Sequence, residues 1–137
     1  MQIIHLKFTR KNRGIVLITC LYVLVFVLML PLRDQAFQDD WAYILSLKKS
    51  LINNSLLIVD WSSSTLVFML IFAGVFSKLF GFSIALTHFT SILLTFLGTI
   101  CFYLLLKRLK IDELKSTIFA ILYFSHPWIF QFSYTFL

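Results

Sequence analysis

The stretch FSIALTHFTSILLTFLGTICFYLLL, Phe82–Leu106, decides the fold class of this chain. It contains no Asp, Glu, Lys or Arg, and His88 is its one side chain that titrates near neutral pH. A transmembrane helix needs about 20 predominantly apolar residues, each adding about 1.5 Å of length. Phe82–Leu106 meets this requirement, so we expect it to cross a bilayer as a single helix.

The composition of the whole chain points the same way. Hydrophobic residues make up 60% of it and charged residues only 13%, whereas soluble domains carry about 25% charged residues. Two further stretches are long and apolar, Gly14–Leu32 and Ser116–Leu137. We therefore predict a single all-α integral membrane domain with three transmembrane helices, at 14–32, 82–106 and 116–137.

The charge distribution predicts whether a shorter apolar stretch, Thr65–Gly81, crosses the membrane. Its uninterrupted core, Leu66–Ser77, would reach only about 18 Å as a helix, against about 30 Å of hydrocarbon. The twelve basic residues form three groups of four. If Thr65–Gly81 stays on one side, eight of them lie inside and four outside, whereas a crossing leaves five inside and seven outside. Because basic loops favour the cytoplasm, we predict a helix lying in or dipping into the outer leaflet. A fourth crossing is the alternative.

The same rule orients the chain in a cell membrane. Residues 1–13 and the turn 107–115 are predicted to be cytoplasmic, and 33–81 form an external loop. Asp112 and Glu113 are predicted to pair with neighbouring lysines and to start the third helix. Nucleic acid is not an expected partner, because the basic residues adjoin the ends of apolar runs and form no separate basic face.

The external loop contains a second predicted interfacial helix at about 39–53, in addition to the one at about 65–80. Its sequence DDWAYILSLKKSLI has helical periodicity. An apolar face is expected at the headgroup boundary, made of Trp41, Ile44, Leu45, Leu51 and Ile52. The opposite face is expected to carry Tyr43, Ser46, Lys49, Ser50 and Asn53. Asp39 and Asp40 fall in the first turn, where carboxylates favour the helix dipole.

Three other polar residues have structural interpretations. Asp60 precedes Ser and Thr residues and is predicted to cap the next helix. His88 is predicted to make a contact between helices. Pro127 is predicted to kink the third helix, because proline removes one backbone hydrogen bond.

The order of these features resembles the N-terminal portion of the GT-C glycosyltransferases. The similarity rests on the order and spacing of QDDWAY (38–43), VDWSSSTLVF (59–68), FSKLFGFS (76–83) and SYTFL (133–137). Enzymes of this class, such as protein O-mannosyltransferases and lipid A aminoarabinose transferases, take a sugar from a polyprenyl-linked carrier. The resemblance implies that this chain is the catalytic-loop segment of an inverting glycosyltransferase. Its expected partners are the bilayer, the polyprenyl-linked sugar donor, an acceptor of unknown identity and the remaining spans of a longer enzyme.

The resemblance also implies roles for individual residues. Asp39 corresponds to the general base that acts on the acceptor hydroxyl, and Asp40 to an acid that orients the partner or binds a divalent cation. Tyr43, Lys48 and Asp60 are the expected substrate-binding residues. No cofactor is implied other than the divalent cation that Asp40 could bind, and paired aspartates without further ligands are a weak signature of a metal site.

Two departures from the family pattern limit these expectations. The second acid is Asp40, where Glu is common, and the chain carries far fewer spans than the family usually has. We therefore expect an incomplete enzyme that is inactive alone. The alternative is a small non-enzymatic membrane accessory or structural protein, in which the acidic pair only starts a helix.

Overall fold

The computed structural model describes residues 13–29, 40–60, 67–127 and 129. This part of the chain is 85% helical and contains no strand, so the predicted all-helical fold class is confirmed. Its five helices are α1 (Arg13–Met29), α2 (Asp40–Asn53), α3 (Val67–Phe80), α4 (Ile84–Arg108) and α5 (Glu113–Ser125). The helices expected at 39–53 and 65–80 are therefore present as α2 and α3.

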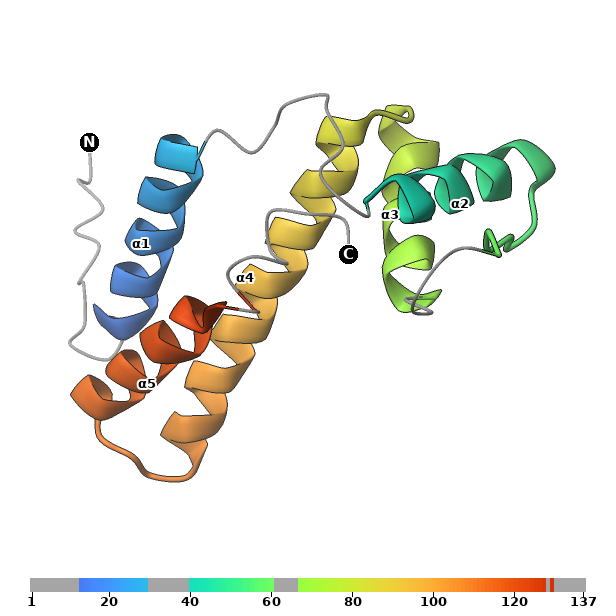
Figure 1. Cartoon of the computed structure of the whole chain (residues 1–137). Coiled ribbons are helices and arrows are strands. Elements are labelled where there is room, and N and C mark those ends of the chain that lie inside the picture. The colour runs from blue at the N-terminus through green and yellow to red at the C-terminus, as the bar shows by residue number, and fades with distance from the viewer. Residues whose placement is uncertain (1–12, 30–39, 61–66, 128, 130–137) are drawn as a thin grey trace, which may run out of the picture.

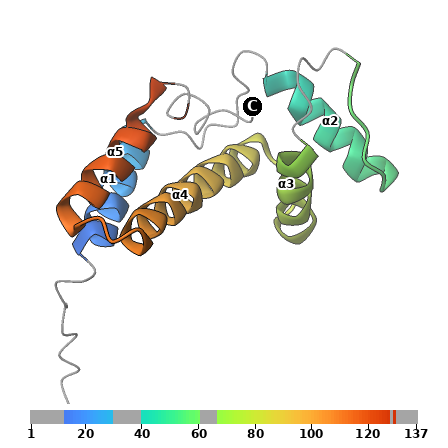
Figure 2. The same ribbon diagram turned by 90° about the horizontal axis from the view of Figure 1, so that it is seen from below.

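Helix α4 is the element to which the other helices attach (Figure 1). Helices α1 and α5 lie side by side along its C-terminal part, and α3 packs at its N-terminal end with α2 against it. Figure 2 shows the same two groups at opposite ends of α4. The fold therefore has two packing centres joined by one long helix.

The first packing centre joins α1, α4 and α5. Its fully buried residues are Ile18, Tyr22, Tyr103, Ala120 and Phe124. The Tyr22 ring lies 4.1 Å from the Phe124 ring, centroid to centroid. Its hydroxyl lies 2.8 Å from Thr99 Oγ1. This buried hydrogen bond satisfies the tyrosine hydroxyl, so the ring can fill the core without an unpaired polar group.

The second packing centre joins α2 and α3. It is formed by Ala42, Tyr43, Ile44, Leu47, Val59, Leu70 and Ala73. The segment after α2 is held against the helix by Ser46, whose Oγ accepts a hydrogen bond from the Val59 N–H at 3.0 Å. The same hydroxyl donates to the Ala42 carbonyl at 2.7 Å. Because Ser46 is fully paired, its burial costs little.

The predicted faces of α2 are partly wrong. Residues of the predicted apolar face differ in burial: Ile44 packs inside the protein at 3% exposure, whereas Trp41 and Ile52 are 49% and 71% exposed. Tyr43 and Ser46, assigned to the polar face, are buried instead. The difference arises because α2 packs on α3, which buries the side of α2 that carries Tyr43 and Ser46. Ser46 can be buried there because its hydroxyl is hydrogen-bonded. An assignment of helix faces from periodicity uses only the polarity of each side chain. It therefore cannot predict that a polar side chain is buried with its hydrogen bonds satisfied.

Only α4 is long and apolar enough to cross a membrane among the helices of the described residues. Helices α1 and α3 are shorter apolar helices, and α5 has 13 residues. Three spanning helices are therefore not shown. Residues 30–32, 128 and 130–137, which the predicted first and third spans include, lie outside the described residues.

Helix α5 ends where the sequence predicts a kink. Its last residue is Ser125, and His126 follows with φ −58° and ψ 128°. A residue that precedes proline is driven to such an extended ψ by contact with the proline ring. Pro127 and Ile129 are helical again, so the interruption is local to His126.

Candidate functional site

The candidate site is a buried contact between α2 and α4. Asp40 is the first residue of α2, and its Oδ2 lies 3.1 Å from Nε2 of His88 in α4. Both side chains are 0% exposed. A carboxylate and an imidazole so completely removed from water are expected only as a pair, because each alone would be costly to bury.

Local sequence sets the position of His88. Gly81 has φ +87°, a left-handed conformation that glycine adopts without steric cost, and it closes the turn after α3. Ser83 then caps α4, because its Oγ accepts the Leu86 N–H at 3.1 Å. This fixed start places His88 in the second turn of α4, on the side that faces α2.

The structure describes one of the two predicted catalytic acids. Asp39 lies outside the described residues. Asp40 is fully buried against His88, so in this conformation its carboxylate is closed to an acceptor in solution. The buried Asp40 carboxylate is better placed to hold α2 against α4 than to contact a substrate directly.

The predicted substrate-binding residues differ in burial. Tyr43 is 2% exposed and packs in the α2–α3 core, on the same side of α2 as Asp40. Lys48 is exposed and lies eight residues from Asp40, about 12 Å along the helix axis. Asp60 is exposed, and α3 begins only at Val67. Its predicted capping role is untested, because 61–66 lie outside the described residues.

His88 is a functional candidate whose partner could not be predicted from the sequence. The prediction that it makes a contact between helices is confirmed. The available signal was a lone ionisable group in an otherwise uncharged span, which is a functional candidate by default. Its pairing with Asp40 joins residues 48 positions apart, and only the packing of α2, α3 and α4 brings them together.

The described residues hold no group of three or more His, Cys, Asp or Glu side chains able to bind a metal ion. Asp40 and His88 supply two such side chains at most. Hard divalent cations usually take six or more oxygen ligands. The described side chains at the Asp40–His88 contact therefore do not support the binding of a divalent cation there.

Comparison of the chain with protein-family models, with curated proteins and with solved structures gave no match.

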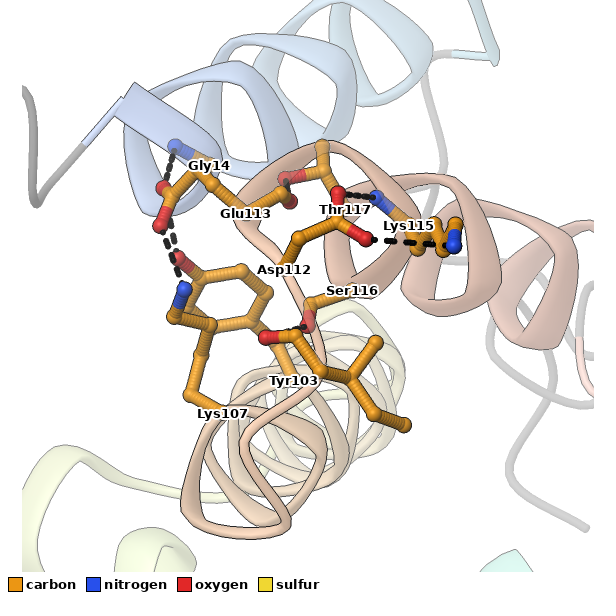
Figure 3. Close-up of polar contacts among 9 residues, drawn as sticks. Gly14, Tyr103, Lys107, Asp112, Glu113, Lys115, Ser116 and Thr117 are labelled. Carbon is orange, nitrogen blue, oxygen red and sulfur yellow. Dashed lines mark hydrogen bonds and ion pairs between the residues drawn. The ribbon is translucent and has the colours of Figure 1, made fainter.

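A second polar cluster lies at the opposite end of α4 and ties three helices together (Figure 3). Glu113 Oε1 accepts the Tyr103 O–H at 2.7 Å and the Gly14 N–H at 2.9 Å. Its Oε2 lies 3.0 Å from Lys107 Nζ. One carboxylate thus joins the start of α1, the end of α4 and the start of α5.

The predicted roles of Asp112 and Glu113 are confirmed. Asp112 caps α5 through its Oδ2, which accepts the Lys115 N–H at 3.1 Å, and its Oδ1 lies 3.6 Å from Lys115 Nζ. Glu113 pairs with Lys107. Both acids start the helix and both pair with a neighbouring lysine.

Glu113 should make the stability of the fold depend on pH. The Tyr103 hydroxyl, the Gly14 N–H and Lys107 hold the pKa of Glu113 below its ordinary 4.5, with the Tyr103 hydrogen bond as the largest cause. A carboxyl with a lowered folded-state pKa gives its full stabilisation above the ordinary value and loses it as pH falls through the lowered value. We expect the thermal unfolding midpoint in detergent to fall below about pH 4.5.

A matched pair of variants isolates this effect. Glu113→Gln keeps the size of the side chain but removes its charge, so the variant should lose the part of the acid dependence that Glu113 causes. In Asp112→Asn the asparagine still caps the helix, so this variant should keep the dependence that Glu113 causes. Equal acid dependence in the wild type and Glu113→Gln would contradict this assignment.

Proposed function

We propose that the chain is an integral membrane protein with its N-terminus in the cytoplasm and α2 on the outer side. The position of the charged residues along α4 supports this. His88 and Lys107 are nineteen residues apart, about 28 Å along the axis, close to the thickness of a hydrocarbon layer. Five basic residues lie at the Lys107 end, on the starts of α1 and α5, the end of α4 and the turn between α4 and α5: Arg13, Lys107, Arg108, Lys110 and Lys115. They suit the cytoplasmic side.

Within that arrangement, we propose that the chain is the N-terminal part of an inverting glycosyltransferase that uses a polyprenyl-phosphate-linked sugar. The observation that carries the proposal is the Asp40–His88 contact. The contact supports the proposal because it holds the start of α2 at the end of α4 remote from the basic cluster, which is the outer end in the arrangement proposed above. There a lipid-linked donor and a water-borne acceptor can meet.

The proposed chemistry assigns the two acids different tasks. Asp39 removes the proton of the acceptor hydroxyl as the hydroxyl oxygen attacks the anomeric carbon of the sugar. The bond from that carbon to the lipid phosphate oxygen breaks, its electron pair leaves with the phosphate, and the configuration inverts. Asp40 is a positioning residue, because its pairing with His88 anchors the helix that Asp39 precedes. Fixed placement of the base is a large part of the rate gain in such reactions.

A non-enzymatic accessory or structural membrane protein is the second candidate, and one observation favours it. Asp40 is 0% exposed and held by His88, a geometry that a purely structural helix contact would also have. The two candidates differ in Asp39, which the enzyme requires and the accessory protein does not.

The test of the enzyme is Asp39→Asn in the full reading frame that contains this chain. Membranes carrying it are supplied with a labelled polyprenyl-phosphate sugar, and transfer to acceptor is counted. We expect at least a hundredfold loss of transfer, the usual scale of a general base, with unchanged membrane insertion. Asp112→Asn is the matched control, because it neutralises an acid at the other end of the bundle and keeps the helix cap.

Two results would argue against the enzyme. Undiminished transfer by Asp39→Asn would remove this residue from the mechanism. Labelling of a cysteine placed at position 39 from the cytoplasmic side would put the acidic pair on the wrong face for the proposed donor.

A further inference from the structure

A groove between α2 and α3 lies away from the Asp40–His88 contact. Its volume is about 240 Å³. Leu47 and Leu70 form its buried wall, at 1% and 3% exposure, and Ile71 and Val75 form a half-exposed rim. The α3 residues that line it recur every three or four positions up to Lys78, so it follows one face of α3 for about 12 Å.

The groove is apolar along its length and cationic at one end. Lys78 lines it in the last turn of α3. This lysine is exposed, and no carboxylate of the described residues lies within salt-bridge distance of its ammonium group. Asn54 and Ser55, which follow α2, add an amide and a hydroxyl to the lining.

The surroundings of the groove are also apolar. On α3, Phe68 and Leu79 are 67% and 70% exposed beside Ile71 and Val75. A set of exposed large side chains along one helix marks a surface that contacts lipid or another apolar partner. An occupant of the groove must therefore present an apolar chain to its walls and a negative charge to Lys78, which only an anionic amphiphile does.

We propose that this groove binds one anionic glycerophospholipid. Its phosphate pairs with the Lys78 ammonium group, and one acyl chain lies along Leu70, Ile71 and Val75. The bound lipid holds the α2–α3 pair at the membrane surface. The residues that line this groove are not among those to which the proposed sugar transfer assigns a role.

Two variants test the two halves of the site. Lys78→Gln removes the charge, and Lys49→Gln is its control, since Lys49 is also exposed but does not line the groove. Gly74→Leu fills the groove. A Cβ at Gly74 would meet only Leu47 Cδ1 at 3.7 Å, an ordinary contact, so the larger side chain can extend into the open space. Gly74→Ala is the control for the backbone change.

The measurement is native mass spectrometry of the full chain in detergent, mixed with equal amounts of phosphatidylglycerol and phosphatidylcholine. We expect the wild type, Lys49→Gln and Gly74→Ala to retain one phosphatidylglycerol. Lys78→Gln should retain about tenfold less, the scale of one lost charged hydrogen bond, and Gly74→Leu none. Millimolar inorganic phosphate should not displace the lipid, because it cannot fill the apolar walls.

Other outcomes would overturn the proposal. Equal retention of phosphatidylcholine would contradict the preference for an anionic lipid, and full retention by both Lys78→Gln and Gly74→Leu would place the lipid elsewhere. Preferred retention of an added polyprenyl phosphate would assign the groove to the sugar carrier instead. Since the readout is lipid retention without sugar, loss of transfer in Asp39→Asn leaves it unchanged.

Discussion

Gly14→Ala should lower the free energy of unfolding by about 3 kcal/mol, the upper part of the range for an overpacked core. A Cβ at this position would lie 2.5 Å from Thr117 Oγ1 and 2.6 Å from Tyr103 Cε2. The Tyr103 ring is 1% exposed and also forms part of the first packing centre, so it cannot move aside cheaply. The shift would also disturb the Gly14 and Tyr103 hydrogen bonds to Glu113.

The measurement is the unfolding midpoint of the purified chain in detergent, followed by circular dichroism. Gly98→Ala is the matched control. A Cβ there would meet only Tyr123 Oη at 3.9 Å, and alanine favours a helix interior by about 1 kcal/mol over glycine. This control should be neutral or stabilised. Equal midpoints for the two variants would mean that α1 does not pack closely on α4 and α5.

The sequence predicts most helix positions because the signals for them are local. Uncharged runs and the basic residues at their ends mark the helices, and the expected 39–53 and 65–80 differ from α2 and α3 by two residues or fewer. The lysines that pair with the two acids at the start of α5 are near them in the sequence: Asp112 pairs with Lys115, and Glu113 pairs with Lys107. Spacing along the chain is therefore enough to predict them.

The candidate site was less predictable because its geometry depends on packing between distant segments. The sequence singled out Asp40 and His88 separately, as a helix-start acid and a lone histidine. Nothing in their spacing shows that they meet, and nothing in the periodicity of α2 shows that Tyr43 faces inward. Both facts follow from the packing of α2 on α3 and of α3 on α4, which turns one side of α2 away from solvent and brings its first residue to His88.

The Glu113 cluster shows the same limit. Its pairing with Lys107 follows from proximity in sequence, whereas its bond to the Gly14 N–H joins residues 99 positions apart. That bond depends on α1 lying beside α5 at the start of both helices. The close approach of the two helices is possible because residue 14 has no side chain.

His88→Leu should have the other large effect, a loss of about 3–5 kcal/mol, the cost of removing one partner from a buried ion pair or its equivalent. Leucine occupies similar space, so the loss reports the missing imidazole near the Asp40 carboxylate and not a cavity. The comparison variant is Tyr22→Phe, which removes the buried hydrogen bond to Thr99. Because that bond joins neutral groups and Thr99 also donates to the Thr95 carbonyl, its loss should cost only about 1 kcal/mol.

The location of the effect separates a local contact from general destabilisation. Since α2 and α3 form one packing centre and α1 and α5 the other, His88→Leu should speed amide hydrogen exchange in α2 while α5 stays protected. Adding Asp40→Leu should restore part of the stability, because two apolar side chains can replace a buried pair at little cost. If the double variant were as unstable as the sum of the two single variants, Asp40 and His88 would not be energetically coupled. Asp40 would then lose its role in anchoring α2, and the placement of the acidic pair would need another cause.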